Sequence, residues 1–211
     1  MNDRVKNVLE WVYCIVIAFV LALLFRYFIA TPTVVKQRSM FPTLKAEQRL
    51  VLDRTYRITG KEPKVGDIVT FEAPSKIFTV ETANQNNPIA KYEHNINGII
   101  SKFFYYTLEL TKTSYIKRVI ATEGDHVVIK ENTVYVNGKA IDESEYLSED
   151  VVTDAIVFND FIVPEDCVFC MGDNRVQSTD CRDFGCIPLE KVEGRVKYRV
   201  WPLNNFGKID K

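Results

Sequence analysis

A lysine is the best-suited general base in this chain, because its histidines are few and poorly placed for catalysis. The two histidines are His94, in a polar stretch, and His126, at the start of a strand pattern, and each is more typical of a surface or structural histidine. A lysine does the same work when burial lowers its pKa by up to ~3 to 5 units from ~10.4. In the run SYIKRVIA at residues 114–121, strand alternation would place Lys117 and Arg118 on opposite faces. One of them can then enter a site while the other forms an ion pair.

Four short motifs accompany this lysine in order along the chain. They are SMFPTL at residues 39–44, GDIV at 66–69, YIKRV at 115–119, and GDNR at 172–175 followed by Ser178, Asp180, Arg182 and Gly185. Together they resemble the sequence boxes of the type I signal peptidases, in the form found in Gram-positive bacteria. The resemblance implies a membrane-bound serine endopeptidase that removes signal peptides from exported preproteins by means of a Ser-Lys dyad.

The resemblance also implies a role for individual motif residues. Ser39 is implied as the nucleophile, and Lys117 as the base that takes its proton and returns it to the leaving amine. Ser178 is similar to the family residue whose hydroxyl hydrogen-bonds this lysine. The other supporting residues are implied to form two ion pairs, Asp180 with Arg182 and Asp173 with Arg118. No metal and no cofactor are expected.

The oxyanion hole is where this chain departs from the family pattern. The backbone N–H of Ser39 is the expected donor. Two residues earlier much of the family has serine or glycine, whereas this chain has Gln37, and Arg38 replaces a small or acidic residue. Gln37 either donates through its side-chain amide or leaves the oxyanion to the backbone.

An extended segment before the nucleophile is implied to bind the substrate. The resemblance makes this segment a strand edge that accepts the extended preprotein by β-augmentation, selecting small side chains at the first and third positions before the cut. The residues of this edge are Thr33, Val34, Val35, Lys36 and Gln37.

The N-terminal segment has the length and composition of a transmembrane helix. Residues 11–30 read WVYCIVIAFVLALLFRYFIA, close to the ~20 residues that cross a hydrocarbon core. The single charge, Arg26, can snorkel to the interface. A cleaved signal peptide and a buried core helix are the alternatives. At ~3.3 Å per extended residue, Ser39 would lie within roughly 30 Å of the bilayer surface.

The charges that flank this helix do not decide its orientation. Arg4 and Lys6 precede it, whereas Arg26, Lys36 and Arg38 lie at its end or beyond. We expect a single-pass protein of the cell membrane, with its N-terminus in the cytoplasm and its catalytic domain on the extracytoplasmic side. Its expected partners are preproteins with small residues at the cleavage site and the lipid bilayer.

Beyond Pro32 the sequence changes to short alternating runs that predict a mostly β, antiparallel domain. The predicted strands are 33–37, 49–53, 66–71, 115–121, a meander over 126–141 with a turn at Asn137-Gly138, and runs within 159–171 and 195–201. The predicted organisation is a short tail at 1–10, an anchor at 11–30, and a catalytic domain at 31–211 with an insertion at about 72–114.

Part of the insertion has apolar residues at helical spacing, which predicts a short amphipathic helix. These residues are Ile96, Ile99, Ile100, Phe103, Phe104 and Leu108. The helix either packs on the sheet or lies at a membrane interface.

The five cysteines leave the redox state of the domain open. Cys14 fits the anchor as a small hydrophobic residue. Cys167 and Cys170 would point to opposite faces of one strand, which argues against a zinc pair. Cys181 and Cys186 either form a disulfide or remain free thiols.

The charge balance argues against nucleic acid as a partner, because 27 lysines and arginines face 28 acidic residues, for a net charge of −1. Two other functions compete with the peptidase. Self-cleaving regulators of the LexA-like group share a Ser-Lys dyad, but they carry a DNA-binding segment instead of a membrane helix. A membrane-anchored binding domain without chemistry is the second.

Overall fold

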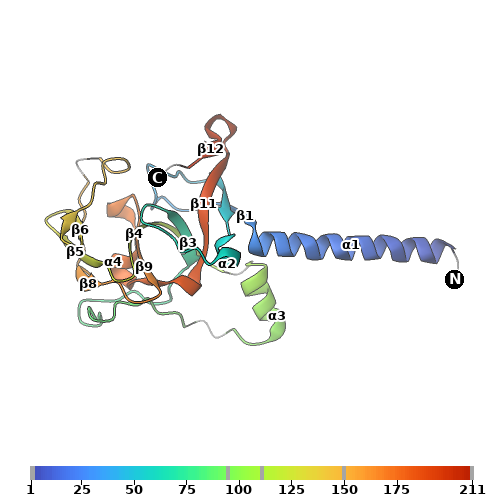
Figure 1. Cartoon of the computed structure of the whole chain (residues 1–211), viewed down its shortest axis with the longest axis horizontal. Helices are drawn as coiled ribbons and strands as arrows, with labels where there is room; N and C mark the ends of the chain where they lie inside the picture. Colours follow the sequence, from blue (N-terminus) through green and yellow to red (C-terminus); the bar gives the residue numbers. More distant parts are fainter. Residues whose placement is uncertain (1–2, 94–95, 110–111, 149–150, 210–211) are drawn as a thin grey trace.

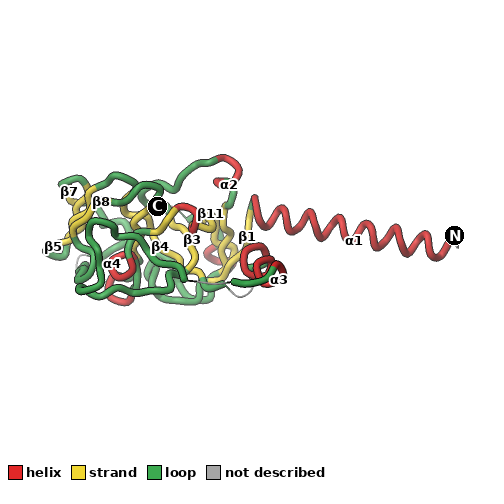
Figure 2. Tube along the Cα trace, turned by 90° about the horizontal axis from the view of Figure 1, so that it is seen from below, coloured by secondary structure: helices red, strands yellow, loops and turns green. Residues whose placement is uncertain are grey.

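The structure is a computed structural model that describes residues 3–93, 96–109, 112–148 and 151–209. One long helix projects from a β-rich domain (Figure 1), and the view turned by 90° shows the same separation (Figure 2). Every strand pair within its two sheets is antiparallel. The predicted fold class, mostly β with an N-terminal helix, is therefore confirmed.

The helix α1 extends from Asp3 to Phe28. Its sequence contains neither glycine nor proline, so nothing interrupts its backbone hydrogen bonds. The segment Arg4–Phe28 is long and apolar enough to cross a membrane, and none of its most apolar window is buried against the domain. The helix already includes most of the residues expected to form a tail at 1–10, because the polar residues there are compatible with helix.

The larger sheet has 8 strands, in the order β1-β2-β11-β3-β4-β9-β10, with β12 paired to β11. It contains the strands on either side of Ser39 and the strand that carries Lys117. Its strands are β1 (Ala30–Val34), β2 (Arg49–Asp53), β3 (Ile68–Glu72), β4 (Ser114–Thr122), β9 (Cys167–Met171), β10 (Ile187–Pro188), β11 (Val192–Trp201) and β12 (Gly207–Lys208).

Strand β1 forms an edge of this sheet and follows α1 with only Ile29 between them. The predicted bounds 33–37 are wrong, because pairing with β2 already begins where Ala30 lies opposite Asp53 and the strand ends at Val34. Pro32 has no N–H to donate, and an edge strand is the position in a sheet that tolerates this loss.

The smaller sheet has the order β7-β6-β5-β8 and contains the predicted meander. Its strands are β5 (His126–Lys130), β6 (Thr133–Val136), β7 (Lys139–Ala140) and β8 (Asp160–Ile162). Asn137 and Gly138, at the predicted turn, both have positive φ, 53° and 75°. This is the backbone of a two-residue hairpin turn, which explains why that dipeptide marked the turn in the sequence.

Short helical segments connect the strands. They are α2 (Tyr56–Thr59), α3 (Ile99–Lys102), the π-helical turn η1 (Phe103–Thr107), η2 (Arg175–Gln177), α4 (Cys181–Phe184), η3 (Leu189–Lys191) and η4 (Leu203–Asn205). The adjoining α3 and η1 lie in the segment between β3 and β4, where the sequence predicts a helix. No residue of α3 is buried, and Tyr105 is the buried residue of η1.

Two apolar clusters stabilise the domain, and the smaller one fixes the loop after β1. That cluster contains Val35, Met40, Leu44, Leu50, Leu52, Ile68 and Val196. Met40 and Leu44 are 1% and 0% exposed, so burial holds the chain immediately after Ser39 against the sheet. The larger cluster includes residues of β4 and β9.

Candidate active site

Ser39 lies in the loop between β1 and β2 and is held there by the backbone. Its carbonyl accepts a hydrogen bond of 2.9 Å from the N–H of Asn174, and the side chain of Asn174 donates to the carbonyl of Arg38 over 3.2 Å. The residue is only 7% exposed. The first and the last of the four sequence motifs therefore meet at the serine.

Lys117 approaches this serine from the middle of β4. In the sheet it lies opposite Val69 of β3, and its side chain is 1% exposed. Its Nζ lies 2.6 Å from the Oγ of Ser39, within hydrogen-bond reach. The ring of Tyr115 lies 5.4 Å from the same nitrogen. Two residues 78 positions apart in sequence are thereby brought into direct contact.

The surroundings of Lys117 favour its neutral form. Burial lowers the pKa of Lys117 below its ordinary value, because an ammonium ion loses its hydration when it enters the protein. The nearby carboxylate of Asp180 acts in the opposite direction and raises this pKa, but burial has the larger effect. A neutral amine beside a serine hydroxyl is the arrangement that base catalysis requires.

Arg118, the neighbour of Lys117, forms an ion pair instead of entering the site. Its Nε and NH2 donate to the two carboxylate oxygens of Asp173, over 2.9 and 2.8 Å. Asp173 also accepts a 2.6 Å hydrogen bond from the hydroxyl of Thr43, in the loop of Ser39. Both charged side chains are at most 2% exposed. This pair therefore ties β4 to the serine loop and to the chain after β9.

Asp180 and Arg182 form a second buried ion pair. Nε and NH2 of Arg182 donate to the carboxylate of Asp180 over 2.8 and 2.9 Å, and the N–H of Gly172 donates to the same carboxylate over 3.0 Å. Burial alone would raise the pKa of Asp180, but the hydrogen bonds and charge of Arg182, together with the Gly172 N–H, hold this pKa below its usual value. Asp180 thus stays ionised behind Lys117.

Gly172 allows the serine loop and the chain after β9 to approach each other. A Cβ at this position would lie 2.5 Å from the carbonyl oxygen of Ser39 and 2.2 Å from the Oγ of Ser178. Such contacts are too short for real atoms, so only glycine fits between these two residues. The glycine of the GDNR motif therefore has a steric explanation.

The expected hydrogen bond between Ser178 and Lys117 is not present. The Ser178 Oγ is buried and forms no hydrogen bond with Lys117; it lies near the carboxylate of Asp180 and helps to hold the pKa of Asp180 below its usual value. Its hydroxyl lies against Gly172, on the side where a Cβ would collide with it. The resemblance correctly predicted that Ser178 lies near the site, but its hydrogen bond to Lys117 was predicted wrongly, because a sequence motif does not specify the side-chain rotamer.

Two hollows meet at Ser39. The larger, about 390 Å³, is lined by residues 31–37 and by Thr113, which precedes β4, together with Ser114 and Ile116 at its start. The smaller, about 320 Å³, is lined by Tyr115, Gln177 and Thr179 together with residues 37–39. An extended chain can therefore pass Ser39 with residues on both of its sides. The residues implied to bind substrate, Thr33 to Gln37, all line the larger hollow.

Gln37 lines both hollows, and its side chain is exposed. It thus lies close to Ser39, and its role as an oxyanion donor stays a prediction. Arg38 lines only the smaller hollow and is also exposed.

The second wall of the larger hollow is a feature that the sequence interpretation missed. Ser114 hydrogen-bonds Glu193 over 2.9 Å, and Lys112 forms an ion pair of 2.8 Å with the same carboxylate. At the end nearest α1, Arg54 is 1% exposed and forms a 2.6 Å ion pair with Glu109. The available signal was that residues 112–116 directly precede Lys117, because the chain that brings the lysine to Ser39 also brings these residues to the hollow.

His126 does not belong to this site. The ring of His126 lies on the exposed surface and pairs with Asp160 over 2.7 Å, and His94 lies outside the described residues. In the part of the chain that the structure describes, no group of three or more His, Cys, Asp or Glu is arranged to hold a metal ion.

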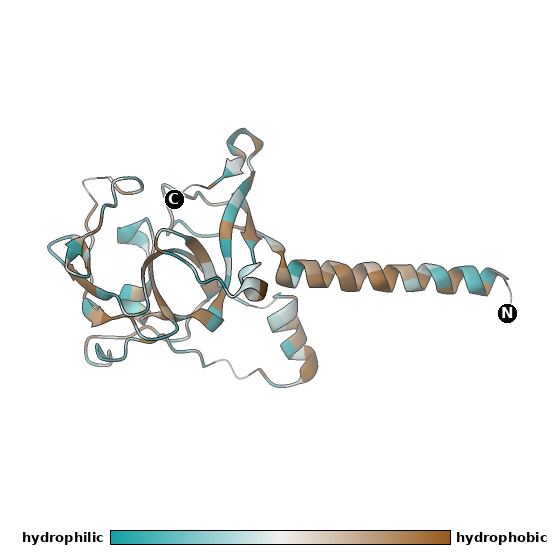
Figure 3. Ribbon diagram, viewed as in Figure 1, coloured by the Kyte–Doolittle hydropathy of each residue, from teal (hydrophilic) through white to brown (hydrophobic). Residues whose placement is uncertain are grey.

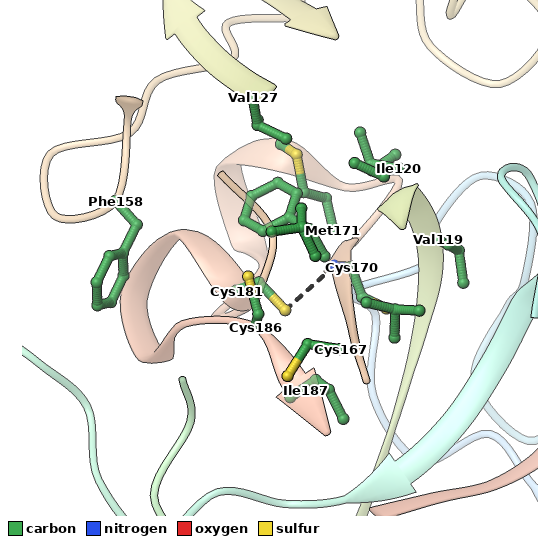
Figure 4. Packing of buried hydrophobic residues seen from close by; sticks show 14 of the residues in the cluster. Val119, Ile120, Val127, Phe158, Cys167, Cys170, Met171, Cys181, Cys186 and Ile187 are labelled. Atoms are coloured by element: carbon green, nitrogen blue, oxygen red, sulfur yellow. Dashed lines mark hydrogen bonds between the residues drawn. The ribbon is translucent and has the colours of Figure 1, made fainter. Parts of the chain in front are cut away.

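The late cysteines are free thiols packed among buried hydrophobic residues (Figure 4). Cys167, Cys170, Cys181 and Cys186 are all at most 3% exposed. The backbone N–H of Cys170 donates to the sulfur of Cys181 over 3.1 Å. Burial raises the pKa of Cys181 and of Cys186, so both are neutral thiols at physiological pH. These side chains serve as small apolar residues of the larger cluster.

Comparisons with known proteins agree on one family. A family model described as "Signal peptidase, peptidase S26" matches residues 8–201. Signal peptidase I of Bacillus licheniformis is 34% identical, over 99% of this chain and 97% of its own length. Signal peptidase IB of Staphylococcus aureus (strain COL) is 31% identical, over 95% of this chain and 93% of its own length. A crystal structure of a signal peptidase I from Enterococcus faecalis V583 is 23% identical and covers 64% of this chain and 97% of that one, with a TM-score of 0.39.

Proposed function

The chain belongs to the signal peptidase family, peptidase S26, and from this premise we propose that it is a membrane-anchored endopeptidase working through a Ser39-Lys117 dyad. It is a serine peptidase, and family membership supports the removal of signal peptides as its activity. The observation that carries the dyad is the 2.6 Å separation of Lys117 Nζ and Ser39 Oγ at a buried position. The competing LexA-like interpretation is set aside, since the family match includes most of α1.

The two side chains together account for both chemical steps. Neutral Lys117 accepts the proton of Ser39 Oγ while that oxygen bonds to the scissile carbonyl carbon. The protonated amine then donates its proton to the leaving nitrogen, the peptide C–N bond breaks, and an ester on Ser39 remains. In the second step, Lys117 accepts a proton from water while the water oxygen attacks the ester. The bond from Ser39 Oγ to the carbonyl carbon then breaks, Lys117 returns the proton to this oxygen, and the signal peptide is released.

The ion pairs would position this dyad without touching substrate. Asp180 is held by Arg182 and by the backbone of Gly172, and Asp173 ties Arg118 to the serine loop. Ser178 would act as a supporting residue through Asp180, because its hydroxyl lies beside Gly172 and helps to keep the Asp180 carboxylate ionised. The backbone N–H of Ser39 would bind the developing oxyanion, with the Gln37 amide as the second donor.

The free side of β1 would bind the cleavage region of the substrate. The N–H of Val35 donates to Gln48, and the carbonyl of Val35 accepts from Glu47, over 2.9 and 2.8 Å, so both groups point toward β2. Strand alternation then turns the backbone groups of Val34 and Lys36 toward the open edge. These are the groups that an added substrate strand would pair with.

The domain organisation follows from the same proposal. The family and the apolar α1 indicate a membrane-anchored enzyme. We place the anchor at about residues 11–30 and the catalytic domain at 31–211, with the insertion at about 72–114. We further propose a cytoplasmic N-terminus and an extracytoplasmic catalytic domain, which is the side from which an exported preprotein presents its cleavage site.

Cleavage of a preprotein tests the proposed function directly. The full chain in detergent is expected to cut an exported preprotein once, after small residues at the first and third positions before the cut, because the family resemblance implies this selection. The matched substrate has leucine at both positions and is expected to remain uncut. N-terminal sequencing of the product identifies the cut.

Binding of the preprotein by folded protein without any cut would support the anchored binding domain instead of the peptidase. A cut that was indifferent to the leucine substitutions would contradict the proposed selection of small side chains.

The pH dependence of cleavage tests the protonation state of Lys117. Below its pKa the ammonium form cannot accept the proton of Ser39, and above it the neutral amine can. Since burial lowers this pKa, activity should rise through one ionisation below the ordinary lysine value of ~10.4. Initial rates between pH 5 and 10 measure it, with circular dichroism confirming that the protein stays folded. A flat profile over this range would be incompatible with a depressed lysine pKa.

A further inference from the structure

The helical insertion exposes a group of large apolar side chains, which we call the apolar face. Ile99 and Ile100 of α3 are 88% and 73% exposed, and Phe103, Phe104 and Tyr106 of η1 are 40%, 43% and 45% exposed. In Figure 3 the brown, apolar colour of α1 appears again at one end of α3. Adjacent exposed apolar residues in this number mark a surface that meets something other than water.

The same segment is attached firmly to the domain on its other side. Tyr105 is 6% exposed, and its hydroxyl donates to the buried carboxylate of Glu72 over 2.9 Å. At the end of η1, NH2 of Arg26 donates to the carbonyl of Leu108 over 2.6 Å. The apolar face therefore belongs to a fixed part of the structure and cannot turn inward without breaking these contacts.

The apolar face lies beside the proposed membrane anchor. An apolar groove of about 280 Å³ separates the two, lined by Val20, Leu23, Leu24, Tyr27 and Phe28 of α1 and by Phe103 and Thr107 of η1. Val20 precedes Phe28 by roughly 12 Å along the helix, at 1.5 Å per residue. Both views place α3 next to the last turns of α1 (Figures 1 and 2). The insertion thus reaches the height of the apolar span.

We propose that α3 and η1 insert into the interfacial layer of the bilayer, with the apolar face in lipid. The proposal rests on the proposed membrane anchoring of α1. The sequence allowed two interpretations of the helix in the insertion: it packs on the sheet, or it lies at a membrane interface. The proposal favours the membrane interface. Lipid is the material that covers the apolar face, because the groove beside this face continues into the surface of α1. The surface of α1 is unburied at the same height. The exposed Lys102, the last residue of α3, supplies a cation for lipid phosphate.

Insertion would give the enzyme a second contact with the membrane. The first is α1, which enters the domain through β1, and the second is attached to Glu72 at the end of β3. Two contacts fix the tilt of the domain on the bilayer, whereas a single helix leaves it free to rotate.

Quenching by brominated lipid tests the proposal in the full chain. Trp11 and Trp201, the two tryptophans, are replaced by phenylalanine, and Ile100→Trp provides a single probe in vesicles of phosphatidylcholine. The matched control is Ile162→Trp in the same background, since Ile162 is 61% exposed in β8, at the end of the domain away from α1. Bromination of the acyl chains is expected to lower the emission of the probe at position 100 by about twofold or more and leave position 162 unchanged.

The outcomes separate this proposal from the proposed function. An unquenched probe at position 100 overturns lipid insertion, even where the same vesicles cleave preprotein. Quenching that a synthetic signal peptide abolishes would overturn it too, because the occupant would then be the substrate helix. Quenching at position 100 without any cleavage by the parent chain would leave lipid insertion supported and would contradict the peptidase assignment alone.

Discussion

Replacing Lys117 by methionine is expected to abolish cleavage while leaving the domain at least as stable as the parent. The buried ammonium group is lost, and with it the cost of keeping a titratable amine out of water, whereas methionine has a similar length and volume. Without the amine, Ser39 keeps its proton. We expect a loss of about 10³-fold or more in the rate of preprotein cleavage, in the range of general base catalysis. Initial rates and thermal unfolding of the full chain in detergent measure both effects.

Two further variants make this result specific to the dyad. Ser39→Ala should lose as much activity as Lys117→Met, and the double variant should lose no more than either, because the two side chains act as one unit. Lys130→Met is the control, since Lys130 is exposed on β5 and lies on the other sheet. Retention of full activity by Lys117→Met would exclude it as the base.

Removal of Asp173 is expected to have the largest effect on stability. Asp173→Ala leaves the Arg118 guanidinium buried at 1% exposure without its carboxylate and also removes the acceptor of the Thr43 hydroxyl. Breaking one partner of a buried pair costs about 3 to 5 kcal/mol, since the remaining charge is uncompensated. Urea unfolding of the full chain in mild detergent, followed by circular dichroism, measures the change.

The matched control is Asp160→Ala, which removes an ion pair with His126 on the exposed surface. Its unfolding midpoint should stay near that of the parent, because solvent already screens this pair. Adding Arg118→Leu to Asp173→Ala should recover part of the lost stability by removing the unpaired charge. Equal losses for Asp173→Ala and Asp160→Ala would show that burial of the pair is not the cause.

The sequence predicted the sheet well where side chains alternate and turn residues mark the ends. The strand predicted at 49–53 has the bounds of β2, and the turn at Asn137-Gly138 joins β6 to β7. The substrate strand was misplaced by three residues because β1 begins directly after a helix, where no turn residue separates the two. Pro32 also read as a boundary, although it lies within an edge strand.

The site was predictable as a set of residues but not as a set of contacts. The order of the motifs predicted that Ser39 and Lys117 belong to one site. Only the three-dimensional structure shows that Ser178 makes no hydrogen bond to the lysine. The helical period in the insertion was correctly read as a helix. Its exposure could not be read, because hydrophobic spacing says which side chains share a face but not what covers that face.

The junction between α1 and β1 has a consequence for how the cleavage site is chosen. Ile29 is the one residue between them, and both of its backbone groups are occupied: its N–H donates to Phe25 over 2.8 Å, and its carbonyl accepts from Arg54 over 2.9 Å. No hinge separates α1 from the edge strand that leads to Ser39, so under the proposed anchoring of α1 in the membrane Ser39 would stand at a fixed height above the lipid. The distance from the bilayer to Ser39 would then limit where a preprotein can be cut. At ~3.3 Å per extended residue, a preprotein whose cleavage site lies a few residues too near or too far from its own apolar helix would miss the serine.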